Sequence, residues 1–404
     1  IEAAAAYSLR NLSDSYAGNV VEVRRSSDNA LRSFTAAEVT DGTLTTWVNT
    51  PYTFYVSNFS SGTDGWQGSD TSVTGNIDEG ADGAGQPPSD NWIRLVAGDR
   101  LSLRNNNIVE SAIISLGGGT YNVIADYYVP SNVFNHKIIA FPSGAQSAGR
   151  NLTVGSGTVT YTISLSDSQA AGLADFRIGS TGNYTTGTKL YFKNIRIQKS
   201  DANGTVSKWY DQSTTSGVPN ANHAVQTDAA KQPKIVSGGL LVTGGLDFDG
   251  VDDFFQASIG TLTQPISGFS VFKNNSLLNS PEIWDSISLT NRVVSFAVAS
   301  DDTFRISAGV AIPSASSSQV DGTTYLRSDL INTTASEGYV NGTLKMSGNA
   351  GTNSMEGLTI GARYDGSVNF TNGSIAEIII YNSDQSANRT ALEANIGEVY
   401  GIAG

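Results

Sequence analysis

Four carboxylate side chains are candidates for chemistry on a sugar. They are Asp211 in WYDQS, Glu282 and Asp285 in SPEIWDS, and Asp365 in ARYDG. Hydrolysis of a glycosidic bond uses two carboxylates that face one another across the bond, about 5 to 9.5 Å apart. The sequence leaves open which of the four would face each other. Asp211 has a simpler interpretation as the cap of its own turn.

A second group of carboxylates has the types and spacing of cation ligands. Calcium takes six to eight oxygen ligands, and GLDFDGVDDFF holds four Asp around a Gly-containing turn. The spacing is not that of an EF-hand, so a strand–turn–strand with solvated carboxylates is the alternative. The calcium candidates are Asp247 and Asp249 in this segment, and Asp78 and Glu79 in GNIDEG. Calcium is the only cofactor that the sequence suggests.

Aromatic side chains are the third set of candidates, because sugar rings stack their C–H faces on flat aromatic groups. The tentative carbohydrate-binding residues are Trp66, Trp92, Tyr127 and Tyr128. Trp66 follows Asp-Gly in a predicted turn, so we expect it to be exposed. Strand alternation should send one of the two adjacent tyrosines inward and the other outward.

Composition excludes several classes of function. The 404 residues have a net charge of −13, which argues against binding of DNA or RNA. The chain has no Cys, so stability must come from burial, ions or assembly. It has no run of 18 apolar residues, so we expect no membrane insertion. Because the first residue is Ile, we expect the chain to be part of a longer polypeptide.

The chain must position these residues on strands. The Ala-rich residues 4–17 predict a helix, 20–24 a strand, and TAAEVTDG a helical turn. From 52 to 199 alternating strands follow one another without a helix between them, as in an antiparallel jelly roll. Residues 53–56 are expected to pair with 192–197, which would bring the two ends of this segment together.

At Val206 the sequence returns to the character of residues 4–47, and it continues as predicted strands. The last segment, SDQSANRTALEANIGEVYG, predicts a helix with Ser386 as N-cap and Gly401 as stop. We therefore predict a nearly all-β chain in which one β-sandwich is interrupted by another, with short helices at the N- and C-terminal ends. Residues 1–49 and 203–404 form the discontinuous domain, and residues 50–202 form the insert.

Four phrases resemble the concanavalin A-like, laminin-G-type sandwich of phage virion and tail proteins. They are AYSLRNLSDSYAGNVVEVRRSSDN, KWYDQS with NHAVQT and KQPKIV, GGLDFDGVDDFFQAS, and IGARYDG with GSIAEIIIYNSDQSANRTALEANIGEVYG. The first two also resemble the catalytic sandwich of fungal family-54 arabinofuranosidases. Asp365 falls near the acidic residue of that family's Gly-Gly-Asp-Asn phrase. No segment resembles the strand with its nucleophilic Glu, and its cysteines are absent, so we expect no enzyme.

The insert resembles carbohydrate-binding jelly-roll modules through VSNFSSGTDGWQG, GNIDEG, DNWIRLV, YNVIADYYVPS and LYFKNIRIQKSD. Together the resemblances imply a structural and adhesion protein on the exposed surface of a bacteriophage virion, as tail, fibre or capsid decoration. The expected partners are other virion proteins, further copies of the chain, and host-surface glycan. The alternatives are an arabinofuranosidase-type glycoside hydrolase and a bacterial surface adhesin.

Overall fold

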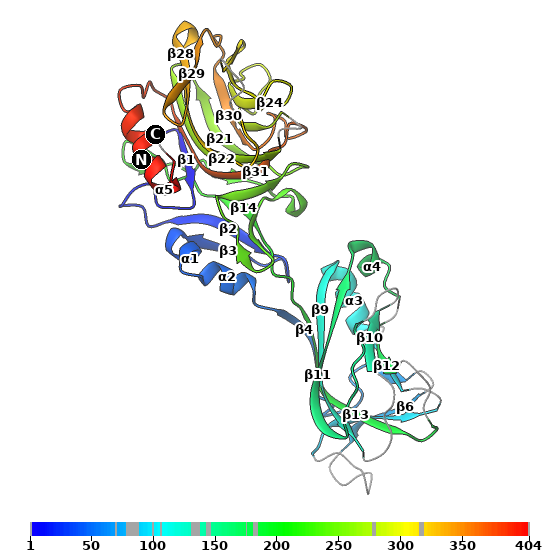
Figure 1. Ribbon diagram of the computed structural model, residues 1–404. Coiled ribbons are helices and arrows are strands. Elements are labelled where there is room, and N and C mark those ends of the chain that lie inside the picture. The colour runs from blue at the N-terminus through cyan, green and yellow to red at the C-terminus, as the bar shows by residue number, and fades with distance from the viewer. Residues whose placement is uncertain are drawn as a thin grey trace. The chain divides into compact units, whose positions relative to one another are not determined.

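The computed structural model is nearly all-β, with a few short helices, which confirms the predicted fold class (Figure 1). It describes residues 2–402 except 69–70, 78–88, 99–100, 106, 131–137, 143–146, 175, 181–184, 277–279 and 315–318. Within the described residues no helix is long and apolar enough to cross a bilayer. Two compact units can be separated by their contacts, and each has its own hydrophobic core.

The first unit, here called the split sandwich, comprises Ile1–Val48 and Ala202–Gly404. The second unit, here called the insert, comprises Asn49–Asp201. Strand pairing explains why the opening segment belongs with the end of the chain. β1 (Ala5–Ser8) pairs with β31 (Asn372–Tyr381), and β14 (Gly204–Trp209), which directly follows the insert, pairs with β2 (Asn19–Arg25).

The split sandwich has two main antiparallel sheets. The first sheet runs from β31 through β22 (Ile266–Ser276), β27 (Thr324–Ile331) and β28 (Ser336–Val340) to β29 (Thr343–Gly348). The edge of β31 that faces away from β22 pairs with two strands, β1 and β20 (Leu246–Asp249). The second sheet contains, in order, β17 (Ala224–Val225), β21 (Phe255–Leu262), β30 (Met355–Ile360), β23 (Glu282–Asp285), β24 (Val294–Val298), β25 (Thr303–Ser307) and β26 (Ala311–Pro313).

Shorter elements complete the split sandwich. β3 (Leu31–Thr35) extends the β14–β2 pair, and β18 (Lys234–Ser237) joins β14 to β20 and to β19 (Leu240–Leu241). The short pair β15 (Thr214–Thr215) and β16 (Val218–Pro219) stands apart. Two helices follow β3, namely α1 (Ala36–Thr40), which is the predicted helical turn, and α2 (Thr43–Val48). Two 3₁₀ turns, η1 (Ala229–Lys231) and η2 (Thr333–Ala335), lie between strands.

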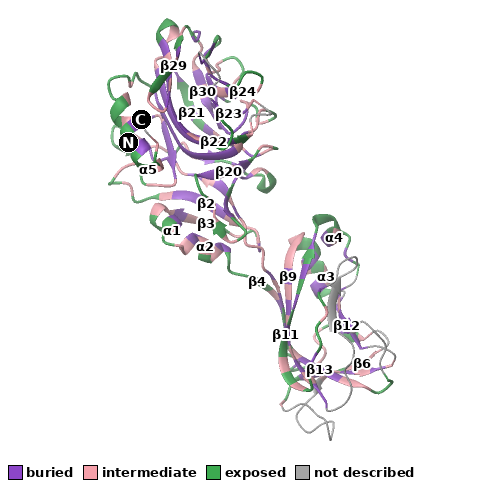
Figure 2. Ribbon diagram, viewed as in Figure 1, coloured by how far each residue is buried: buried purple, intermediate pink, exposed green. Residues whose placement is uncertain are grey.

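The last helix, α5 (Arg389–Tyr400), covers the outer face of the first sheet. Ile378 and Ile380 of β31 point into the core between the sheets, whereas Ile379 packs with Ile396 of α5. Every residue of β31 after Asn372 is buried (Figure 2, purple), so both faces of the strand are covered, and the segment IAEIIIY is apolar except for Glu377. The helix stops at Gly401 as predicted, but it begins after Asn388, which makes no side-chain capping bond, rather than after Ser386.

The predicted helix over residues 4–17 is wrong. Residues 5–8 form β1, in which all four side chains are buried, and residues 2–35 contain no helix. The register aligns Ala5 with Ile380 and Ser8 with Glu377, so β1 extends the first sheet beyond β31. Pairing and burial outweigh the intrinsic helix propensity of the Ala run, which is a weak preference of tenths of a kcal/mol per residue.

The insert is a jelly-roll-like sandwich of two antiparallel sheets. The six-stranded sheet contains, in order, β11 (Gly155–Leu165), β9 (Gly119–Val129), β13 (Lys189–Lys199), β7 (Trp92–Ala97) and β6 (Thr71–Ile77), with β4 (Tyr52–Ser57) also on β13. The four-stranded sheet contains β10 (Ile138–Pro142), β12 (Phe176–Ser180), β8 (Ser102–Arg104) and β5 (Gln67–Gly68). The predicted pairing of the insert's two ends is confirmed, since β4 and β13 pair from Ser57–Ile195 to Tyr52–Lys199.

The expectation of a helix-free insert is wrong. α3 (Ile108–Leu116) connects β8 to β9, and α4 (Asp167–Ala171) follows β11 behind a Ser166–Gln169 capping box. Val109 and Ile113 of α3 are buried in the insert's core. The segment IVESAIISL is compatible with strand or helix, because four of its nine residues are β-branched. The packing of one apolar face against the sheets decides the matter.

Candidate functional site

A hollow of about 310 Å³ opens on the outer face of the insert's six-stranded sheet. This volume is within the range of pockets that bind small molecules. Its lining combines hydroxyl groups, one carboxylate, one ammonium group and one indole, contributed by Ser89, Trp92, Asp126, Ser156, Thr158 and Lys193. The hollow therefore offers hydrogen-bond donors and acceptors within one small opening.

A β-bulge in β13 places two consecutive side chains on this outer face. The pairing of β13 with β9 shifts between Lys193 and Arg196, and Asn194 has a φ of 49°. Phe192 and Ile195 on either side point into the core of the insert. In a regular strand one of Lys193 and Asn194 would also point inward, so the bulge is what keeps both polar side chains out of the core.

Hydrogen bonds hold the charged groups of the hollow in place. Lys193 Nζ donates to Ser89 Oγ at 2.6 Å and lies 4.6 Å from the centre of the Trp92 ring. On the other side, Asp126 accepts from Thr158 Oγ1 at 2.7 Å and from Asn194 Nδ2 at 2.8 Å. The ammonium and the carboxylate are each anchored but keep further capacity for hydrogen bonds.

The aromatic candidates are mostly buried, which corrects the expected stacking platform. Trp66 is 1% exposed and packs in the insert's core against Tyr55 and Phe176, so its predicted exposure is wrong. Tyr127 points into the same core, whereas Tyr128 packs on the outer face against Trp92, as alternation predicts. Trp92 lines the hollow but is 2% exposed, since Tyr128, Tyr191 and the Lys193 ammonium cover it.

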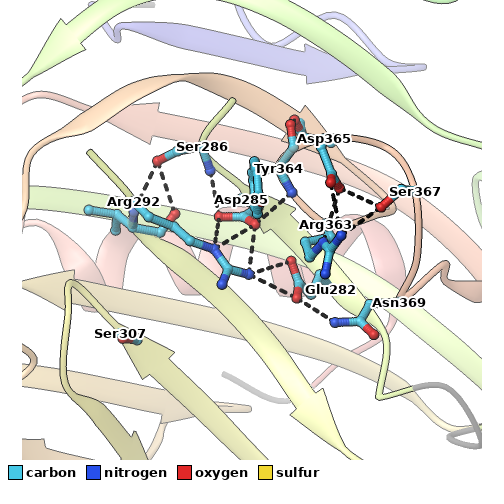
Figure 3. Close-up of polar contacts among 12 residues, drawn as sticks. Glu282, Asp285, Ser286, Arg292, Ser307, Arg363, Tyr364, Asp365, Ser367 and Asn369 are labelled. Carbon is cyan, nitrogen blue, oxygen red and sulfur yellow. Dashed lines mark hydrogen bonds and ion pairs between the residues drawn. The ribbon is translucent and has the colours of Figure 1, made fainter. Parts of the chain in front are cut away.

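Three of the four candidate carboxylates come together in the split sandwich (Figure 3). Glu282 and Asp285 lie on β23 and are buried, and both contact Arg292 Nη2 at 2.9 Å. Asn369 donates to Glu282 Oε1 at 2.8 Å. Arg292 therefore joins the two carboxylates into one buried cluster, in which each oxygen is already used by protein donors.

The electrostatics of this pair follow from burial. The pKa of Asp285 is raised because the group is buried and because the carboxylate of Glu282 lies beside it. Arg292 opposes this shift, and the main-chain N–H groups of Ser286 and Tyr364 each donate to Asp285 at 2.8 Å. The oxygens of both carboxylates are occupied by protein donors, and neither group lines the hollow of the insert.

Asp365 lies at the edge of the cluster with the opposite electrostatics. Arg363 makes two hydrogen bonds to its carboxylate, at 3.0 and 2.8 Å, and Ser367 makes a third. The guanidinium of Arg363 and the Ser367 hydroxyl lower the pKa of Asp365 to about 2. A catalytic acid needs a raised pKa so that it still holds its proton near neutral pH, and Asp365 has lost its proton there.

Asp211 is not part of this cluster. Its side chain accepts from the main-chain N–H groups of Ala6 and Ser213, both at 2.9 Å, and burial raises its pKa. It thereby ties the turn after β14 to strand β1, which agrees with the structural interpretation of WYDQS rather than with a catalytic role.

The turn between β20 and β21, in the segment GLDFDGVDDFF, brings three carboxylates within reach of one cation. Oxygens of Asp249, Asp252 and Asp253 lie within 4.8 Å of one another, whereas Asp247 is not in this group. Burial and the two neighbouring carboxylates raise the pKa of Asp253 to about 7. The turn is also held by its own main chain, because Asp249 accepts from the N–H groups of Val251 and Asp252. Asp78 and Glu79 lie outside the described residues.

Sequence reasoning missed Asp126, Lys193 and Asn194. A signal was present, because KN interrupts the apolar alternation of LYFKNIRI where a regular strand would need one inward residue. It did not reveal the partners, since Asp126 is 67 positions before Lys193 in the sequence and reaches it only through the β9–β13 register.

No family model and no curated protein matches the chain. Solved structures with partial likeness include a Trypanosoma rangeli sialidase in complex with sialic acid, at 11% identity and TM-score 0.34, covering 80% of this chain and 53% of that one. A tandem CBM22 domain of Paenibacillus barcinonensis Xyn10C has 8% identity and TM-score 0.30, with coverages of 82% and 98%. Domains LG4-5 of mouse laminin α1 have 10% identity and TM-score 0.26, with coverages of 70% and 84%. The chain spans about half the length of the sialidases.

Proposed function

We propose that this chain is a non-enzymatic structural and adhesion protein of a bacteriophage virion, and that its insert binds host-surface glycan. The observation on which glycan binding rests is the hollow beside the β13 bulge. Asp126 accepts hydrogen bonds there, Lys193 donates them, and Ser156 and Thr158 add hydroxyl groups. Sugar hydroxyls are both donors and acceptors, so this mixture suits them.

The virion assignment rests on the resemblance of the four quoted phrases to phage virion and tail proteins. Within this proposal the split sandwich attaches the insert to other virion proteins or to further copies of the chain. Many copies on one particle would multiply a weak single-site affinity for sugar by raising its effective concentration at the host surface. The chain would then be located on the exposed surface of the particle.

The hydrogen bonding of the carboxylates favours adhesion over hydrolysis. Glu282 and Asp285 are buried around Arg292 and leave no gap for a sugar between them. Asp365 is ionised well below neutral pH and so cannot protonate a leaving group. The hydrolase alternative requires one of these groups to act as an acid or a nucleophile, and each is instead held by a guanidinium.

Glycan-array binding of the full chain tests the adhesion proposal. We expect a defined set of glycans to bind, and Lys193→Ala and Asp126→Ala each to weaken binding about tenfold or more, because each removes a hydrogen bond to a charged group. Arg196→Ala is the matched control on the same strand and should not change binding. If no glycan binds, or if Lys193→Ala and Arg196→Ala behave alike, the insert does not bind glycan through this hollow.

Two further measurements address the remaining parts of the proposal. Mass spectrometry of purified phage particles should detect the chain among the virion proteins, and its absence from every particle of the producing host would contradict the virion assignment.

Release of sugar from arabinan-like polymers should not occur. Turnover that Glu282→Gln or Asp365→Asn abolishes would replace adhesion by hydrolysis.

A further inference from the structure

The split sandwich has a second hollow, of about 110 Å³, on the outer face of its first sheet at the start of α5. Phe269 and Leu330 form its apolar part, and Ser328, Glu337, Tyr339 and Arg389 provide its polar groups. This volume is several times the roughly 10–15 Å³ that a single water needs in a cavity. It can hold one edge of a small ring while the rest stays in solvent.

Ser328 is the most informative residue of this hollow. It lies on β27, where Tyr325 and Ile331 point into the core between the sheets and Leu326 packs on the α5 side. Alternation places Ser328 on the same side as Leu326, facing the hollow. The residue is 2% exposed, and its Oγ has no hydrogen-bond partner among the described residues. A buried hydroxyl without a partner is unfavourable, and a ligand atom in the hollow would satisfy it.

Arg389 and Glu337 leave complementary hydrogen-bonding capacity at the same opening. The Arg389 guanidinium lies 3.7 Å from the centre of the Tyr339 ring and donates to Glu393 Oε2 at 2.5 Å. This is its one side-chain hydrogen bond within the described chain, although a guanidinium has five N–H donors. Glu337 accepts from Tyr339 Oη at 2.8 Å through Oε2, so Oε1 is left as an acceptor.

The charges decide which ligand fits. Glu393 neutralises Arg389, and Glu337 makes no ion pair with a described residue, so the hollow has a net negative charge. A carboxylated or phosphorylated ligand would meet this charge without compensation. A neutral polyol would not. Its adjacent hydroxyls can accept from the guanidinium and from Ser328 and donate to Glu337, while its C–H face contacts Phe269 and Leu330.

We propose that this hollow binds one neutral sugar unit, held by Ser328, Glu337 and Arg389. The site belongs to the split sandwich and shares no residue with the hollow of the insert, so it stands independently of the glycan site proposed there. The unit can be a free monosaccharide or the end of an oligosaccharide, because the hollow takes only one edge of a ring.

Saturation-transfer NMR on the full chain, with millimolar glucose, galactose and mannose and with glucuronate as the charged counterpart, tests this site. At least one neutral sugar should give a saturable signal, glucuronate should bind more weakly, and an oligosaccharide ending in the same sugar should bind as well as the monosaccharide. A lack of any neutral-sugar signal, tighter binding of glucuronate, or binding of the oligosaccharide alone would overturn the proposal.

Variants assign the signal to the hollow. Ser328→Ala and Glu337→Gln should each weaken binding, Glu337→Gln about tenfold because a bond to a charged acceptor is lost. Ser270→Ala is the matched control, since Ser270 is also buried with an unpartnered Oγ but does not line the hollow. Lys193→Ala should leave this signal unchanged. If Ser328→Ala binds like the parent chain, or if Lys193→Ala abolishes the signal, the sugar does not occupy this hollow.

Discussion

Lys193 and Asn194 follow one another on β13, yet the two side chains reach partners on the same outer face of the insert's sheet. Lys193 donates to Ser89, and Asn194 donates to Asp126. The left-handed conformation of Asn194, with φ of 49°, makes this arrangement possible. Asn tolerates that conformation better than most residues, so the bulge and the hydrogen bond to Asp126 depend on the same side chain.

Substitution of Asn194 should separate backbone strain from hydrogen bonding. Asn194→Ala loses the bond to Asp126 and places a Cβ in a left-handed conformation, so we expect a loss of about 2 kcal/mol in the free energy of unfolding of the insert. Asn194→Gly loses the bond but accepts the conformation, and should lose about half as much. Urea denaturation measures both. Equal losses would mean that the positive φ contributes no strain.

Removal of Arg292 should destabilise the split sandwich strongly. Arg292→Ala leaves Glu282 and Asp285 buried without their cation, and breaking a buried pair in this way costs about 3–5 kcal/mol. Arg292→Lys should recover only part of this, because an ammonium cannot reach both carboxylates as a planar guanidinium does. Arg305→Ala, which removes the more exposed pair with Asp301, is the control and should change stability by less than about 1 kcal/mol. Similar effects of the two Ala variants would contradict the importance of burial.

The raised pKa of Asp253 predicts how stability depends on pH. In the folded chain its pKa is about 7, against an ordinary value of 3.8 for an aspartate side chain. Between these values the folded state holds a proton that the unfolded state has released, so this contribution is complete below about pH 4 and is lost as pH rises to 7. Asp253→Asn should flatten the fall of unfolding free energy over this range. The slope should be measured after EDTA treatment, since calcium bound to the three carboxylates would oppose protonation.

Asp365 should titrate far below the range of a catalytic acid. Carboxyl NMR should find its pKa near 2, and Arg363→Met should raise that pKa because the guanidinium is the largest cause of the shift. Ser367→Ala should raise it less. A pKa above 5 in the parent chain would remove the electrostatic argument against the hydrolase alternative.

Elements whose local sequence pattern agrees with their packing could be predicted without the structure. The helical turn predicted at TAAEVTDG is α1, Gly401 ends α5, and alternation specifies strands such as β9 and β11. The pairing of β4 with β13 was also predictable, because an inserted module must bring its two ends together.

Elements and contacts that depend on distant partners could not be predicted from local patterns. Residues 5–8 have the composition of a helix but become β1, since β31 and the turn held by Asp211 provide their hydrogen bonds. Trp66 is in a polar turn but is buried by Phe176, over a hundred residues later. The polar groups of both hollows likewise meet only through strand register and the packing of α5. Local propensity amounts to tenths of a kcal/mol per residue, whereas burial of a large side chain amounts to about 1.5–3 kcal/mol, so long-range packing decides wherever the two disagree.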